Sequence, residues 1–185
     1  MKSLGLFILR VVYGGLLAGH GGQKLFGWFK GPGLQGTGQW LESLGLQPGE
    51  QWARLAAASE LGGGTLTAAG FLNPIGPLLS MGAMGMATAK VHWGKPIWVS
   101  SGGAELPVTN LAIATSLALA GPGKLSLDGL LGTRLPRWLV VPGVLAVAGA
   151  VALGVQASQQ QRQQATQAEQ RAEQIERPEA QATRA

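Results

Sequence analysis

The sequence is poor in charged residues and contains no cysteine. Charged residues make up 12% of its 185 residues, whereas soluble domains usually contain about 25%. This shortage indicates that lipid, not water, surrounds much of the chain. The absence of cysteine excludes disulfides, thiolate metal sites, iron–sulfur clusters held by this chain alone and thiol nucleophiles.

The net charge of +5 does not indicate nucleic-acid binding once the charges are located along the chain. Residues 156–185 contain four arginines and four glutamates, so the positive excess lies in residues 1–155. The cations there stand mostly at the ends of apolar segments, where Lys and Arg meet lipid headgroups. The 30 glycines fit this setting, because transmembrane helices use glycine for close packing. We therefore expect the lipid bilayer, and no nucleic acid, as a partner.

Apolar stretches predict the fold class, an all-α integral membrane bundle. Four helices are expected within residues 1–130, at about residues 4–22, 51–72, 76–91 and 105–120. At roughly 1.5 Å per residue, the first can cross a hydrocarbon core of roughly 30 Å. A cleaved signal peptide is the alternative for this segment, but Arg10 and Tyr13 interrupt it and no clean cleavage pattern follows.

The C-terminal part adds a fifth helix and a polar tail. Residues 131–155 are predicted as an additional transmembrane helix that follows a polar boundary made of Lys124, Asp128, Arg134 and Arg137. Residues 156–185 contain ten glutamines and almost no apolar face. We expect this tail to be a solvated helix or disordered, without a role in an active site.

The predicted topology gathers ionisable residues near one membrane face. Face A is defined as the face where the first helix starts, and face B as the opposite one. Charges within membrane spans are costly and usually face a bundle interior, a partner charge or a water-filled cavity. Six candidate residues from four helices lie near face B: His20, Lys24, Glu60, Lys90, His92 and Glu105.

The first helix carries a polar stripe beside a small-residue motif. Spacings of three, seven and four residues place four polar side chains on one face, which we expect to point into the bundle: Arg10, Tyr13, His20 and Lys24. Gly15 and Gly19 form a G-x-x-x-G pair on a neighbouring face. This pair predicts close packing of another helix.

Several chemical roles are open for these residues. Glu60 is expected on the order of 10 Å below face B, where a carboxylate must be protonated or paired with Arg10, Lys24 or Lys90. A structural ion pair and a proton relay beside a quinone are the alternatives. The two histidines suit interfacial positions or, as a less favoured alternative, haem ligation. Without a carboxylate at ligand spacing they predict no metal site.

The order of several short motifs resembles the DoxX family of small bacterial membrane proteins. The motifs are Leu9-Arg10, Gly14-Gly15, His20-Gly21, Lys24-Leu25, Glu60 ahead of Gly62-Gly63-Gly64, and residues 102–107 and 121–128. The resemblance covers residues 4 to about 130. It implies a four-helix membrane bundle related to the DoxD-like subunit of thiosulfate:quinone oxidoreductase. It also implies a multi-pass position in a bacterial or archaeal plasma (inner) membrane.

The resemblance leads to a first hypothesis, a membrane subunit of an oxidoreductase system with a polar pocket near face B. His20, Glu60 and His92 would handle protons there. A second set of residues would bind substrate or form ion pairs: Arg10, Lys24, Lys90 and Glu105. No cofactor motif is recognisable, although a quinone is compatible with the pocket. A soluble redox enzyme or a bound cofactor must supply the electrons.

Two further hypotheses need no chemistry from the chain. It can act as a non-catalytic scaffold that recruits a soluble redox enzyme to the membrane, with its buried charges serving architecture. It can also transport a small solute, but that requires a continuous polar path, and the sequence offers little near face A except Arg10. An oligomer is compatible with all three hypotheses. An odd number of crossings would send the C-terminus to the face opposite the N-terminus.

Overall fold

The computed structural model describes residues 2–133 and 135–182, with side chains as far as residue 174. Within these residues the chain is helical and contains no β-strand. Arg134 and the last three residues of the predicted tail lie outside the described residues. The predicted all-α fold class is confirmed for this part of the chain.

The helices follow one another with short connections. The α-helices are α1 (Lys2–Phe26), α2 (Gly33–Ser43), α3 (Gly49–Ala69), α4 (Ile75–Ala87), α5 (Glu105–Ala120), α6 (Leu127–Leu131) and α7 (Val140–Ala182). Three short 3₁₀ segments are η1 (Trp28–Lys30), η3 (Val99–Ser101) and η4 (Arg137–Leu139). A π-helical segment, η2 (Thr88–His92), continues α4.

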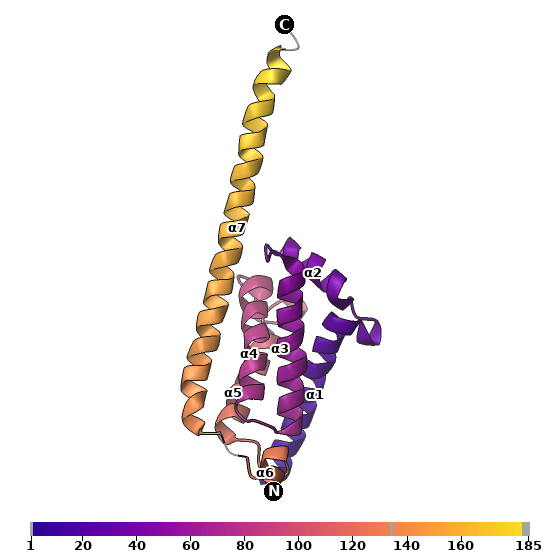
Figure 1. Ribbon diagram of the computed structural model, residues 1–185, viewed down its shortest axis with the longest axis vertical. Helices are drawn as coiled ribbons and strands as arrows, with labels where there is room; N and C mark the ends of the chain where they lie inside the picture. Colours follow the sequence, from indigo (N-terminus) through magenta and orange to yellow (C-terminus); the bar gives the residue numbers. More distant parts are fainter. Residues whose placement is uncertain (1, 134, 183–185) are drawn as a thin grey trace.

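The long helices run up and down between two ends of a bundle (Figure 1). The N-terminus, α6 and the start of α7 lie at one end, which corresponds to face A. The short helix α2 lies at the other end, face B, and the C-terminal part of α7 projects well beyond it (Figure 1). Helices α1 and α3 form the most extensive contact, and α4 bridges α3 to α5 and α7.

Helices α1 and α3 approach closely because glycines and alanines line their contact. A β-carbon added to Gly64 of α3 would lie 2.5 Å from the backbone nitrogen of Ala18 in α1. Gly14 meets Gly64 and Ala68 in the same way. The predicted use of Gly15 was wrong, because this glycine is exposed and faces open space. Close packing was predicted correctly, but it uses the small residues one position earlier, on the buried face of α1.

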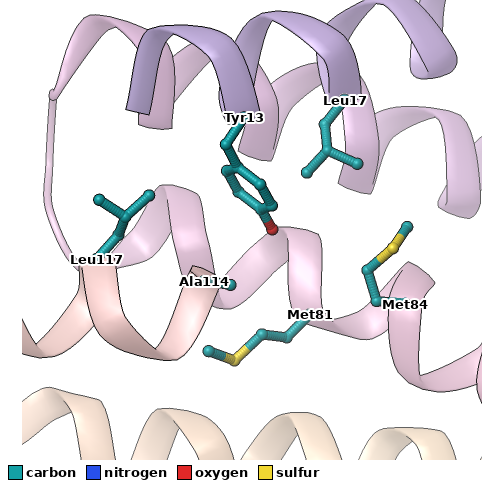
Figure 2. Packing of buried hydrophobic residues seen from close by; sticks show 6 residues of the cluster. All are labelled: Tyr13, Leu17, Met81, Met84, Ala114 and Leu117. Atoms are coloured by element: carbon teal, nitrogen blue, oxygen red, sulfur yellow. The ribbon is translucent and has the colours of Figure 1, made fainter. Parts of the chain in front are cut away.

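The apolar core lies where α1, α4 and α5 meet (Figure 2). Its fully buried members are Tyr13, Leu17, Met81, Met84, Ala114 and Leu117. The ring of Tyr13 points from α1 towards α4, while both methionines fill space beside it (Figure 2). Methionine adapts to irregular gaps between helices, so these residues serve packing.

Polar residues are buried while many large apolar residues are exposed, which reverses the distribution of a soluble protein. Arg10, Glu60 and Asp128 are each at most 5% exposed, whereas Leu16 is 65% exposed. Two segments of the described chain are long and apolar enough to cross a membrane, α1 and Arg137–Gln174. Exposed apolar faces of this extent suit contact with lipid.

Helix α7 packs against the bundle, although the sequence predicts it only as an addition to the four-helix unit. It runs unbroken to Ala182 and packs against α4, where Gly154 accommodates the side chains of Trp52 and Met86. The residues after 156 are mostly glutamine, alanine, arginine and glutamate, which favour helix, so no break marks the predicted boundary. The start of the tail also contacts the bundle, because Gln161 exchanges hydrogen bonds with the backbone of Gln47.

Candidate functional site

The buried carboxylate at face B belongs to an ion pair between α1 and α3. Lys24, in the last turn of α1, donates from Nζ to Oε2 of Glu60. Glu60 is 4% exposed. The glycine-lined contact of these helices brings the lysine stem across to α3. Of the roles predicted for Glu60, the geometry corresponds to an ion pair that joins two helices.

A third helix braces this pair. The hydroxyl of Thr37 in α2 lies 3.5 Å from the backbone oxygen of Lys24, to which it donates. Thr37 is buried and faces the C-terminal part of α1. His20 lies one turn before Lys24 and is exposed, whereas Leu17, three residues earlier in α1, is buried. The predicted stripe therefore includes one residue that does not face the bundle.

Lys90 binds α7 rather than Glu60. It lies in the π-helical segment η2, and its Nζ donates to Oγ of Ser158 at 2.6 Å. Ser158 is 1% exposed and donates in turn to the backbone oxygen of Val155 at 2.8 Å. Single π-helical turns often occur at functional sites. Here the turn directs a lysine to the helix that the sequence predicts to be outside the site.

His92 and Glu105 stabilise the connection between η2 and α5. Nδ1 of His92 lies 2.7 Å from the backbone oxygen of Gly102, so this nitrogen carries the proton. Oε2 of Glu105 accepts from the backbone nitrogen of Val99 at 2.8 Å. Both side chains bind backbone groups of the same loop. They do not contact Glu60 or His20 through any described hydrogen bond.

The six predicted residues of face B are thus near the same end of the bundle but are engaged separately. The ion pair, the Lys90–Ser158 contact and the loop contacts each have their own partners. A groove of about 470 Å³ opens at this end between α2 and α3, and it is lined by Gln35, Glu42 and Glu50 among others. None of the six predicted residues lines that groove.

Arg10 lies towards face A, at the opposite end from Glu60. Its guanidinium is 3% exposed and donates to two backbone oxygens, those of Ala68 in α3 and Leu125 after α5. It also lies 5.3 Å from the centre of the Phe7 ring, within the range of a cation–π contact. Its Nε has no hydrogen-bond partner. No carboxylate pairs with it among the described residues.

Asp128 is a buried polar residue whose role the sequence did not predict. Its two carboxylate oxygens accept from the backbone nitrogens of Leu72 and Asn73, at 3.0 and 2.9 Å. Its own nitrogen donates to the oxygen of Gly70. In the sequence, Asp128 is a lone carboxylate two residues after Ser126, the residue that caps α6. A capping sequence does not reveal which distant loop the carboxylate binds.

Tyr13 joins α1 to α4 within the core. Its hydroxyl lies 2.9 Å from Oγ of Ser80 in α4. Because Ser80 donates to the backbone oxygen of Pro77, Tyr13 is the donor in this pair. Every long helix of residues 2–92 is therefore tied to another by a buried polar contact. The arrangement can hold helices in register.

The DoxX family model matches residues 5–93, from α1 to the residue after η2. The matched segment includes Arg10, Lys24, Glu60, Lys90 and His92. The resemblance around residues 102–128 lies outside the match and stays a prediction. No curated protein and no solved structure matches the chain.

Proposed function

The chain belongs to the DoxX family of membrane proteins, and from this premise we propose that it is a non-catalytic subunit that holds a soluble redox enzyme at the membrane. One observation carries the proposal. Five of the six predicted residues near face B are bound to a side chain or to the backbone: Lys24, Glu60, Lys90, His92 and Glu105. Groups engaged in this way fix helix packing.

Helix α7 supplies the recruiting element. Residues 162–174 are exposed on all sides and project past face B. They carry both signs of charge, with Arg162 and Arg171 among Glu169 and Glu173. A polar helix of this kind can bind a partner through side-chain charges at no cost to the bundle. Five membrane crossings, from α1, α3, α4, α5 and α7, would place this helix on the side opposite the N-terminus.

The test is site-specific cross-linking from the tail. A photoreactive amino acid at Gln167 should capture a soluble protein that carries a redox cofactor, identified by mass spectrometry. The same group at Gln39, an exposed position of α2, is the matched control and should capture less of it. Equal capture at both positions, or capture of no cofactor-containing protein, would contradict the proposal.

A subunit that takes part in quinone or thiol chemistry is the second candidate. The observation that favours it is the exposed His20, one turn before Lys24 in α1, which places an imidazole at the same end of the bundle as the Lys24–Glu60 pair. Purified chain mixed with a quinone and a candidate donor would distinguish the two. Turnover that Glu60→Gln abolishes, while Glu50→Gln does not, would replace the scaffold by this second function.

A further inference from the structure

An open groove lies at face A, at the end of the bundle opposite the Lys24–Glu60 pair. It has a volume of about 540 Å³ and runs between the start of α1, the end of α3 and the segment that contains α6. Phe7, Leu127 and Leu130 contribute apolar walls, and Arg10 and Lys124 contribute positive charge. Asp128 does not line it. The groove therefore combines an apolar surface with cations alone.

No carboxylate forms an ion pair with Arg10 within the part of the chain whose side chains the structure describes. Its terminal nitrogens donate to two neutral carbonyl oxygens, and its Nε is buried without a partner. Carbonyl dipoles satisfy hydrogen bonds but leave the net charge in place. A buried cation without a counter-ion is costly in a medium of low dielectric constant. An anion held in the adjoining groove would offset this cost.

The surrounding groups strengthen the same field. Lys124 is exposed at the rim of the groove, and Lys2 and Arg137 are exposed at the same end. The nearby carboxylate, Asp128, is 5% exposed and has both oxygens occupied by the backbone amides of Leu72 and Asn73. It cannot turn towards the groove without breaking both bonds. Asp128 keeps its negative charge, but the four cations at this end outnumber it, so the field that a ligand meets at face A is positive.

The apolar walls specify what kind of anion fits. Leu130 is 79% exposed and Leu127 is also exposed beside Lys124. A small inorganic anion would leave these walls uncovered. A molecule with an anionic head and a hydrocarbon tail would neutralise the cations and cover the leucines at once. Its head would lie at the level where α1 begins, which is where lipid headgroups lie if α1 spans the bilayer.

We propose that this groove is a binding site for an anionic phospholipid, with the phosphate near Lys124 and Arg10 and an acyl chain along Phe7, Leu127 and Leu130. Lys124 supplies the accessible charge, and Arg10 supplies a fixed charge behind it. The proposal does not depend on the scaffold function, because it concerns the other end of the bundle. It requires no partner protein and no chemistry.

The test is a lipid titration of the full chain followed by native mass spectrometry. Dioleoylphosphatidylglycerol should bind more tightly than dioleoylphosphatidylcholine. Lys124→Gln should raise its Kd about fivefold, since one cation near a membrane surface contributes about that factor. Lys95→Gln is the matched control, an exposed lysine at face B whose loss should leave the Kd unchanged. Both substituted lysines are exposed, so both variants should fold.

Three outcomes would overturn the assignment. Equal affinity for the two lipids would show that the headgroup charge is not recognised. An equal loss from the Lys124 and Lys95 variants would show general attraction to a positive surface. Displacement of the phosphatidylglycerol by millimolar inorganic phosphate would show a site for free anions rather than for a lipid. Retention of the lipid in phosphate buffer, together with the loss in Lys124→Gln alone, supports the site.

Discussion

At face B the buried carboxylate of Glu60 meets the ammonium group of Lys24, whereas at face A the buried carboxylate of Asp128 meets backbone amides. The first arrangement cancels charge between two helices. The second uses the only described carboxylate near Arg10 to hold a loop, and leaves the arginine charge in place. The comparison shows that two buried carboxylates of one bundle can have different consequences: one neutralises a cation, and the other leaves a nearby arginine without a counter-ion among the described residues.

The largest expected effect comes from breaking the Lys24–Glu60 ion pair at face B. Glu60→Leu should lower the free energy of unfolding by about 3 kcal/mol, because it leaves Lys24 without its counter-charge. Adding Lys24→Met should restore most of that loss, since two apolar residues of similar size can replace a buried pair. Unfolding by sodium dodecyl sulfate in mixed micelles measures both.

The matched control for this experiment is the exposed pair of Glu50 with Arg54. Both side chains are more than half exposed, so Glu50→Gln should change the free energy of unfolding by at most about 0.5 kcal/mol. If Glu60→Leu changed the free energy of unfolding as little as the control does, the ion pair would not stabilise the helix packing. The scaffold function would then lose its main support.

The next largest effect is expected at face A, where Asp128 binds the loop between α3 and α4. Asp128→Asn should lower the free energy of unfolding by about 2 kcal/mol, because an amide has one oxygen and leaves one of the two backbone nitrogens without an acceptor. The same titration measures this loss. Ser116→Ala is the control, since Ser116 is exposed and bonds within its own helix. A loss no greater than that of the control would mean that Asp128 does not hold the loop between α3 and α4.

These two ends also differ in how far the sequence predicts them. For Glu60 the sequence limits the partner to three cations, Arg10, Lys24 and Lys90, because a charge in an apolar helix must be compensated, and the structure singles out Lys24. Asp128 could not be assigned, because the groups that donate to its carboxylate are backbone amides 55 and 56 residues away, and backbone amides have no sequence signature. The all-α character of the chain, by contrast, is predicted from apolar length and turn residues alone.

The contacts of α7 with the rest of the bundle could not be predicted from the sequence, for a related reason. The continuous apolar run of residues 138–155 predicts a helix that is stable in lipid. Because lipid and α4 are equally apolar neighbours, the run does not predict which of them the helix contacts. What fixes the docking is local shape, as where Gly154 receives Trp52 and Met86, and one hydrogen bond from Lys90 to Ser158. Shape complementarity between distant segments appears only when both helices are placed.

A smaller effect is expected midway between the ends, where no charge is involved. Tyr13→Phe should cost about 0.6 kcal/mol, the usual value of a hydrogen bond between helices in a membrane. The phenyl ring keeps the apolar contacts of the core (Figure 2). A double-mutant cycle with Ser80→Ala measures the coupling. A coupling of zero would show that Ser80 is held by Pro77 alone.

The smallest effect is expected where the chain leaves the bundle. Truncation after Arg162 should change the free energy of unfolding by less than about 0.5 kcal/mol, because residues 163–174 are exposed throughout. Truncation after Val155 should cost more, because it removes the hydroxyl of Ser158 and leaves the ammonium group of Lys90 without its partner. Comparing the two variants in the same titration separates the part of α7 that closes face B from the part that is free to recruit. If the shorter truncation were as damaging as the longer one, the projecting helix would belong to the fold and could not serve as an independent docking arm.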